Sequence, residues 1–173
     1  MKQLFFLLLL SLPLSGYAQK ISKKALKQQE RHEQMLNILN ERSFAMEAYQ
    51  IQDRTGRATM VVSITNFVAV QDSFGVVQIA LNNGRVNKIN LPIREVTEGR
   101  VSRYQVIDKG VGKGFDVKFT FFGIFSYEIL INVDDKGEAR LVLTGNRREY
   151  MRLLGNLVPL AESKIYVTNL EGW

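Results

Sequence analysis

Alternation of apolar and polar side chains between residues 115 and 143 is the feature that most constrains the fold of this chain. Three consecutive runs have an apolar residue at every second position, and a turn sequence separates each run from the next. The apolar rows are Phe115, Val117, Phe119 and Phe121; then Phe125, Tyr127, Ile129, Ile131 and Val133; and then Ala139, Leu141 and Leu143. Because successive side chains of a strand point to opposite faces, this pattern predicts three strands that each bury one face.

Turn sequences divide the chain between residue 44 and the first of these runs into further short segments rich in strand-forming residues. Asn82-Asn83-Gly84 is typical of a type I′ hairpin turn, because Asn and Gly accept the positive φ angles that this turn needs. Short strands with frequent turns indicate an antiparallel sandwich or barrel. We predict a mainly β domain over residues 44–159, an antiparallel β-barrel or strongly curved sheet of about eight strands. Its earlier strands are expected at residues 44–52, 59–65, 67–71, 75–81, 85–91 and 101–108.

The segment before residue 44 has the period of a helix. Ile21, Ala25, His32 and Leu39 lie on one narrow stripe of a helix drawn through residues 19–43, and the segment contains neither Gly nor Pro. We therefore predict one N-terminal helix that packs against the β domain. At the other end of the chain, residues 149–154 are expected to form a helical turn, and residues 160–173 a C-terminal tail or an added strand.

The first eighteen residues are typical of a cleavable secretory signal. Lys2 is followed by an apolar run over residues 4–14, which is too short to span a bilayer as a helix, and small residues follow it. We predict cleavage between Ala18 and Gln19, which leaves 155 residues with no transmembrane anchor. The chain has no Cys, whereas secreted eukaryotic domains usually carry disulfides. These features predict a periplasmic or secreted protein of a bacterial envelope.

Positive charge is concentrated near the predicted mature N-terminus. Without residues 1–18 the chain has 22 basic and 17 acidic side chains, a net charge of +5. The basic residues that gather most closely are Lys20, Lys23, Lys24, Lys27 and Arg31, with a second group at Arg147-Arg148. Such a segment suits a phosphate-rich surface or anionic lipid. A solvated helix face is the simpler interpretation, because runs of one charge usually face water.

Few residue patterns in the chain suit catalysis or metal binding. With one His and no Cys, His32 lacks the partners that a zinc site or a nucleophile needs, so we expect it to pack or to face solvent. The glycines between Gly110 and Gly114 precede an alternating strand rather than a helix, which predicts a hairpin turn and not a phosphate-binding loop. Asp134-Asp135 are interpreted as a solvated turn. We predict no enzymatic activity, no catalytic residue, no cofactor and no metal.

The apolar rows leave two alternatives for the barrel interior. In a closed barrel the candidate lumen-lining residues are Tyr104, Phe119, Phe121, Tyr127 and Ile129. Small barrels are either filled by side chains or hold one apolar ligand, and large aromatic side chains favour the filled core. Because these residues alternate with a polar face, they are expected to be buried, which argues against stacking on nucleic-acid bases.

One family resemblance follows from longer stretches of the sequence. The residues that carry it are Arg100-Val101-Ser102-Arg103-Tyr104-Gln105-Val106, Phe115-Asp116-Val117-Lys118-Phe119, Tyr127-Glu128-Ile129-Leu130-Ile131-Asn132-Val133, Gly137-Glu138-Ala139-Arg140-Leu141, Arg147 and Leu154-Gly155. With the preceding signal and basic helix, residues 20–159 resemble the domain of unknown function 4251 family. The resemblance implies a secreted or periplasmic protein of Gram-negative bacteria with a lipocalin-like antiparallel barrel. It implies no activity and no catalytic residue.

Two departures from the family pattern bear on any shared binding site. The segment from Ile79 to Arg85 stands where the family has a Pro-Tyr-aromatic-Gly stretch, and the tail after Pro159 is additional. We predict an uncharacterised exported envelope protein with a non-catalytic interaction or structural β-domain. The alternative is a lipocalin-like carrier of a small apolar or amphipathic ligand. The expected partner is accordingly an envelope protein or such a ligand.

Overall fold

The computed structural model describes residues 23–53, 55–81, 93–124, 126–145 and 150–165. Several sequence predictions lie outside these ranges. They are the secretory signal with its cleavage site at Ala18 and Gln19, the Asn82-Asn83-Gly84 hairpin with its return strand, and the Arg147-Arg148 pair.

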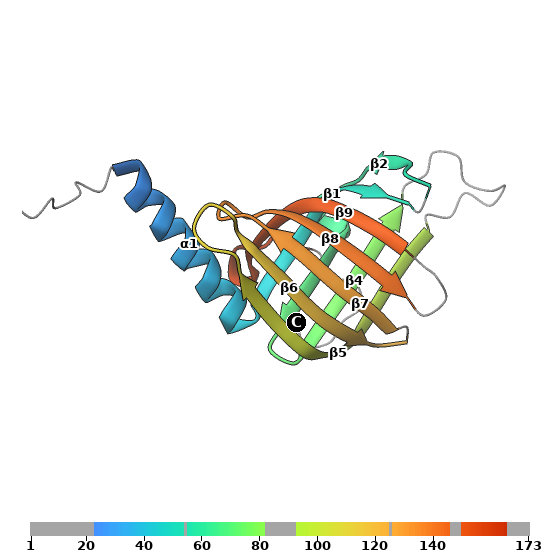
Figure 1. The fold of residues 1–173 in the computed structure, drawn as a ribbon. Helices are drawn as coiled ribbons and strands as arrows, with labels where there is room; N and C mark the ends of the chain where they lie inside the picture. The colour runs from blue at the N-terminus through green and yellow to red at the C-terminus, as the bar shows by residue number, and fades with distance from the viewer. Residues whose placement is uncertain (1–22, 54, 82–92, 125, 146–149, 166–173) are drawn as a thin grey trace, which may run out of the picture.

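Antiparallel strands form a closed barrel (Figure 1). The nine strands of the described residues have the order β2-β1-β3-β4-β5-β6-β7-β8-β9. Because β1 also pairs with β9, eight of them close a ring that leaves β2 outside. The strands are β1 (Ser43–Gln52), β2 (Ala58–Met60), β3 (Phe67–Gln71), β4 (Phe74–Leu81), β5 (Ile93–Asp108), β6 (Phe115–Phe122), β7 (Ser126–Val133), β8 (Glu138–Gly145) and β9 (Tyr150–Pro159). The predicted mainly β fold, an antiparallel barrel with one N-terminal helix, is confirmed.

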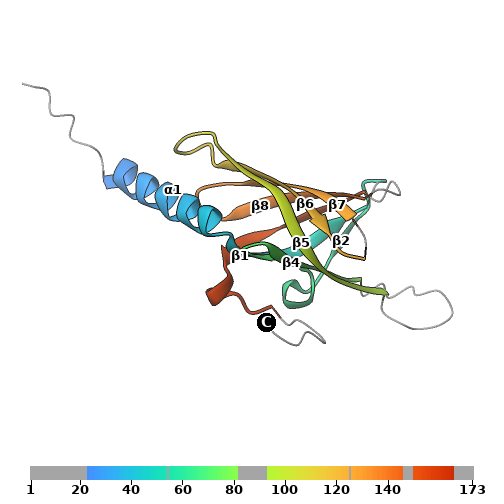
Figure 2. The same ribbon diagram turned by 90° about the horizontal axis from the view of Figure 1, so that it is seen from below.

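The long strand β5 pairs with β4 along its first half and with β6 along its second half (Figure 2). Its residues 93–100 pair with β4, and its residues 100–108 pair with β6. Between Ser102 and Gln105 the register with β6 shifts, and Arg103 has a φ of 53°. Such a bulge inserts an extra residue and bends the strand. The bend carries the end of β5 and the following turn towards the N-terminal helix.

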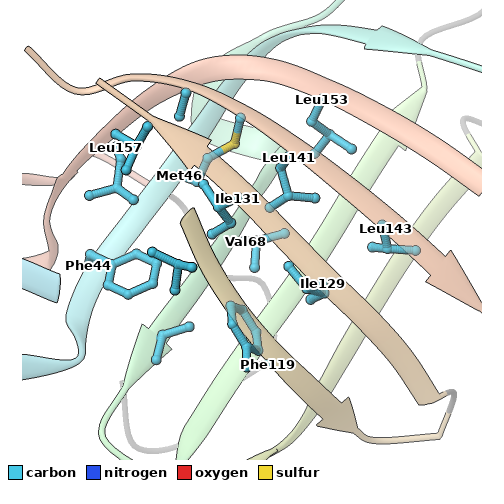
Figure 3. Packing of buried hydrophobic residues seen from close by; sticks show 14 of the residues in the cluster. Phe44, Met46, Val68, Phe119, Ile129, Ile131, Leu141, Leu143, Leu153 and Leu157 are labelled. Carbon is cyan, nitrogen blue, oxygen red and sulfur yellow. The ribbon is translucent and has the colours of Figure 1, made fainter. Parts of the chain in front are cut away.

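The inward rows of the strands meet in one core (Figure 3). Phe119 on β6, Ile129 on β7 and Leu141 on β8 are at most 3% exposed, and Phe44 on β1 is fully buried. The rows predicted from alternation over residues 115–143 therefore face inward wherever their side chains are described. A side chain excluded from water in this way gains about 1.5–3 kcal/mol relative to an exposed one, so these rows are the main source of stability.

A smaller apolar cluster lies on the outer face of β1, β3 and β4. It consists of Ala45, Phe67, Ala69 and Val76, against which Val158, Leu160 and Ile165 pack. The segment after β9 is held there by the Ser163 hydroxyl, which donates a hydrogen bond to Glu47 Oε1 at 2.7 Å. Glu47 Oε1 also accepts the backbone N–H of Lys164 at 3.2 Å. The described part of the C-terminal segment thus covers one wall of the barrel.

The helix α1 (Lys23–Glu41) lies beside one end of the barrel (Figures 1 and 2). Its residues 23–31 are all exposed, whereas His32, Met35 and Leu39 in its second half are buried. Within the described ranges, no helix has the length and apolarity needed to cross a membrane. The helix therefore docks by its C-terminal half and presents its basic N-terminal half to solvent.

Two secondary-structure predictions were wrong. Residues 59–65 are not one strand, because β2 ends at Met60 and a 3-10 helix occupies Ser63–Thr65. There the Asn66 side chain fixes the turn: its oxygen accepts the N–H of Ala80 at 2.7 Å, and its Nδ2 donates to Val62 O at 2.9 Å. The expected helical turn at 149–154 lies in strand β9 for its described residues 150–154.

Pairing on both sides explains the second error. Leu153 on β9 lies opposite Ile51 on β1 and Leu141 on β8, so tertiary contacts override a helix-like local pattern. Of the expected C-terminal tail or strand, Leu160–Glu162 form a 3-10 helix. Lys164 and Ile165 belong to no strand, and residues 166–173 lie outside the described ranges.

Candidate functional site

Three elements distant in sequence meet around the His32 side chain. His32 lies on α1, and its Nδ1 is 2.8 Å from Oδ1 of Asp135 in the β7–β8 turn. Its Nε2 is 3.1 Å from Oδ1 and 3.2 Å from Oδ2 of Asp108 at the end of β5. The imidazole stacks on the Phe115 ring with 4.5 Å between centroids. This cluster fastens the helix to two hairpins of the barrel.

The glycine-rich turn between β5 and β6 is shaped to reach this cluster. Gly110, Gly112 and Gly114 have φ values of 92°, 83° and 71°, in the left-handed region that side chains disfavour. The N–H of Gly110 donates to Asp108 Oδ1 at 2.7 Å, and that of Gly112 donates to Asp135 Oδ2 at 2.6 Å. The predicted hairpin turn is confirmed, and its backbone supplies two donors to the carboxylates.

Asp134 and Asp135 have different roles, which corrects the sequence interpretation of both as a solvated turn. Asp134 Oδ1 accepts the N–H groups of Lys136 and Glu138 at 2.8 and 2.9 Å and so closes the turn. Asp135 is only 8% exposed, and its two oxygens face His32 and Gly112. Adjacent turn residues point in different directions, so one carboxylate shapes the hairpin while the other pairs with the helix.

The electrostatics of the cluster favour a charged His32. Burial disfavours the imidazolium, but the hydrogen bonds and charges of Asp135 and Asp108 outweigh it and raise the pKa of His32 above its usual 6.5. The Gly110 N–H and then His32 lower the pKa of Asp108 below its usual 3.8. Both ring nitrogens of His32 are engaged, so the side chain lacks the free nitrogen that a general base would need.

The C-terminal end of α1 is fixed by a second contact with the barrel. The Tyr104 hydroxyl donates at 2.7 Å to the carbonyl oxygen of Leu39 in the last turn, which also accepts the N–H of Arg42 at 3.3 Å. The Arg42 guanidinium lies 4.8 Å from the centre of the Tyr104 ring. Burial raises the pKa of the Tyr104 phenol, so it stays a protonated donor at neutral pH.

The five candidate lumen residues separate into two groups. Phe119, Phe121, Tyr127 and Ile129 face the interior core and are 1–3% exposed. Tyr104 is only partly buried and lies under α1, with its ring 5.9 Å from that of Phe119. A side chain that lined a water-sized space would keep accessible surface, so neighbouring atoms surround the first four.

Two cavities open on the surface, and one of them adjoins the His32 cluster. A groove of about 430 Å³ lies between α1 and the two turns, and its lining is Lys24, Lys27, Gln28, Arg31, Gly112, Asp134, Asp135 and Lys136. A second cavity, of about 560 Å³, lies against the outer wall of β7, β8 and β9. Its lining includes Tyr49, Lys109, Asn132, Arg140 and Leu154. Volumes of this size accommodate small molecules.

Comparison with known proteins assigns the fold and sequence to a family. The model of the domain of unknown function DUF4251 matches residues 26–157. The chain belongs to the DUF4251 family. It is similar to a DUF4251 family protein from Bacteroides eggerthii DSM 20697, whose crystal structure was determined at 1.95 Å resolution. The two share 28% identity over 78% of this chain and 91% of that one, with a TM-score of 0.64. No curated protein matches the chain.

A metal role for the site does not follow from the geometry of this DUF4251 protein. Among its described residues, no group of three or more His, Cys, Asp and Glu side chains is placed to hold a metal ion. The reason is visible at His32, because Asp135 and Asp108 face opposite ring nitrogens and cannot converge on one point.

The cluster in this DUF4251 protein was missed by sequence reasoning, which found no partner for His32. Asp108 and Asp135 are 76 and 103 residues away from it. The available signal was one Asp at the end of a predicted strand and another in the turn after a second predicted strand, each close to Gly residues. Because hairpins of a barrel that share one rim come close together, these carboxylates were candidates for pairing with a His on the helix stripe.

Proposed function

We propose that this DUF4251 protein is exported to the bacterial envelope and acts there as a non-catalytic interaction protein. The observation that carries the proposal is the contrast between interior and surface. Phe119, Phe121, Tyr127 and Ile129 are almost fully buried, whereas residues 23–31 of α1 are all exposed. A barrel packed in this way offers partners its rim and its helix rather than its lumen. The His32 cluster then serves to hold that helix in a fixed position.

The absence of catalysis is supported by the state of the polar side chains. Both nitrogens of His32 are engaged by carboxylates. Asp116, whose pKa is lowered chiefly by Lys109, accepts hydrogen bonds from Lys109 and Asn132 at 2.7 and 2.6 Å. Groups that are already paired in the resting structure are poor candidates for proton transfer or nucleophilic attack.

Export is proposed from the sequence of residues 1–18, and it has a direct test. N-terminal sequencing of the protein recovered from the envelope fraction of its host should begin at Gln19. Intact protein that begins at Met1 and is found in the cytoplasm would contradict export.

One observation favours the alternative, a carrier of a small apolar or amphipathic ligand. In the described part of the chain, Thr97 Oγ1 is buried and has no hydrogen-bond partner. Thr97 lies opposite Val77, a residue of the interior core, so its position is on the inner side of the barrel. An unpaired buried hydroxyl costs about 1–3 kcal/mol, which a ligand with a polar group could recover.

The two proposals are separated by one pair of measurements. A photo-crosslinking amino acid at position 27 on α1, introduced in the native host, should form adducts with an envelope protein, whereas one at position 118 on the barrel wall should not. Native mass spectrometry of the same purified protein should show the mass of the chain alone. A co-purifying lipid-sized mass, together with no adduct at position 27, would replace the interaction protein with the carrier.

A further inference from the structure

The groove between α1 and the two hairpin turns collects cationic side chains. Lys24, Lys27 and Arg31 line it from the helix, and Lys136 lines it from the β7–β8 turn. All four are exposed, and none of them has an ion pair within the described structure. Among the helix residues that line the groove, three are basic and none is acidic. Four like charges therefore share one cavity of about 430 Å³.

The two carboxylates of the groove are already committed to the protein itself. Asp134 accepts the N–H groups of its own turn. Asp135 pairs with His32 and accepts the N–H of Gly112. Their hydrogen-bonding capacity is directed at the barrel and the helix, whereas the ammonium and guanidinium groups have no partner among the residues that the structure describes. Like charges that face one cavity repel each other, and a bound anion would relieve that repulsion.

The number and kind of these cations indicate the chemistry of the anion. Arg31 provides a planar fork of donors that matches phosphate or carboxylate oxygens in pairs, and the Lys ammonium groups act as point charges. A carboxylate carries one charge, whereas a phosphate monoester carries more than one and presents three acceptor oxygens. We propose that the groove binds a phosphate-bearing anion, with Lys27 and Arg31 from α1 and Lys136 from the β7–β8 turn as its ligands.

The inference goes beyond the proposed function, since it assigns a ligand chemistry to the basic half of α1 whatever envelope protein that helix contacts. A phosphate group can belong to a soluble molecule or to the headgroup of an anionic lipid. Both present the same oxygens to the groove, so the experiment uses one probe for each source. The His32 cluster sets the width of the groove, because it fixes α1 relative to the turn that carries Lys136.

The test measures binding of two probes to the purified protein at low salt. Isothermal titration calorimetry with inorganic pyrophosphate represents the soluble source. Flotation with vesicles of phosphatidylcholine, alone or mixed equally with phosphatidylglycerol, represents the lipid source. Binding to pyrophosphate indicates a soluble ligand, and binding only to the phosphatidylglycerol vesicles indicates a headgroup. Either result supports the proposal if the groove variants weaken it.

Matched variants distinguish the groove from general positive charge. Lys27→Gln and Arg31→Gln should each lower the affinity about tenfold or more, since a hydrogen bond to a charged group contributes more than a neutral one. Lys118→Gln on the barrel wall and Arg57→Gln in the β1–β2 turn remove the same charges elsewhere, and they should leave the affinity unchanged. These four side chains are exposed, so the variants should fold, and thermal melts should coincide with that of the wild type.

Two results would overturn the inference. One is failure of both probes to bind. The other is an equal loss of affinity in the groove variants and in the matched controls, which would show that binding depends on the net charge of the protein and not on the groove. If either occurs while position 27 still cross-links to an envelope protein, the proposed function stands and only the phosphate chemistry fails. If position 27 forms no adduct but pyrophosphate binds in the groove, the protein is a binding protein for a small anion instead.

Discussion

His32 on α1 and Asp135 in the β7–β8 turn lie 2.8 Å apart, although 103 residues separate them in the sequence. The pair is shielded from water, with each side chain 7% exposed. Asp135 also accepts the Gly112 N–H, so the same carboxylate connects the helix, the β7–β8 turn and the glycine-rich β5–β6 turn. Removal of this one group should loosen all three elements together.

The substitution Asp135→Asn tests that role. Oδ1 of the carboxylate faces His32 and Oδ2 accepts from Gly112, so in Asn an NH2 group replaces one of these two acceptors and one donor loses its partner. We expect a loss of about 1–3 kcal/mol in the free energy of unfolding, measured by denaturant melts. Glu128→Gln, on the exposed face of β7, should change it by less than about 0.5 kcal/mol. Equal stability of the two variants would contradict a structural role for the cluster.

The raised pKa of His32 predicts a pH dependence with a definite sign. The unfolded chain has the ordinary value of 6.5, and the folded value lies higher. The stabilisation is therefore complete below pH 6.5 and is lost as the pH rises through the folded pKa of His32. Denaturant melts across the neutral and alkaline range should show this fall in the wild type, whereas His32→Gln should show a flatter profile. A wild type that gains stability over that range would contradict a raised pKa of His32.

Asp108 should affect the pH dependence of stability at the acid end of the pH range. The Gly110 N–H and His32 hold its pKa below the ordinary 3.8. Its contribution is complete above pH 3.8 and is lost as the pH falls through the lower folded value. Asp108→Asn should reduce the dependence of stability on pH in the acid range, and it should also make the alkaline fall smaller, because Asp108 is one of the two carboxylates that raise the pKa of His32. Nuclear magnetic resonance titration of the two groups provides an independent check, and a folded Asp108 pKa at or above 3.8 would contradict the prediction.

Much of the fold could be predicted because strands β6, β7 and β8 each carry their own signal. Every second residue from Phe115 to Leu143 is apolar except where a turn intervenes. A repeat of two residues is typical of a strand that buries one face. Strand β9 has no such signal, because Leu153-Leu154 and Leu157-Val158 repeat at a helical spacing. Its conformation is decided by its two neighbours, β8 and β1, and the pairing with β1 spans most of the chain.

The site could not be predicted because its geometry depends on that closure. His32 meets Asp108 and Asp135 only once the barrel places two hairpins on one rim and the helix beside it. The bulge at Arg103 is a second example. The residues Ser102-Arg103-Tyr104 contain no sequence signal for a bulge. The bulge nevertheless brings the Tyr104 hydroxyl to the Leu39 carbonyl at the end of α1.

The inward and outward phases of β6 can be compared at neighbouring positions. Phe119 is 3% exposed and belongs to the core, whereas Lys118 is exposed on the opposite face. Phe119→Ala should cost about 3–5 kcal/mol in denaturant melts, and Lys118→Ala should stay within about 0.5 kcal/mol. A small loss for both would indicate an open space beside Phe119, because a truncated ring then leaves few contacts behind. That result would favour the carrier over the interaction protein.

Closure of the barrel requires a residue without a Cβ at position 155, which is Gly155. It lies on β9 opposite Ala48, at the point where the β1–β9 register shifts. A Cβ at Gly155 would clash with the Glu47 carbonyl oxygen, and backbone atoms cannot yield as a flexible side chain can. Gly155→Ala must therefore push β9 away from β1, at a cost of about 1–3 kcal/mol or more. Asn156→Ala, at the exposed neighbouring position, should cost less than about 0.5 kcal/mol. Hydrogen exchange should locate the difference, with faster exchange of the β1 and β9 amides in Gly155→Ala than in the wild type. Unchanged protection of these amides would contradict the requirement for Gly at this position of the β1–β9 pairing.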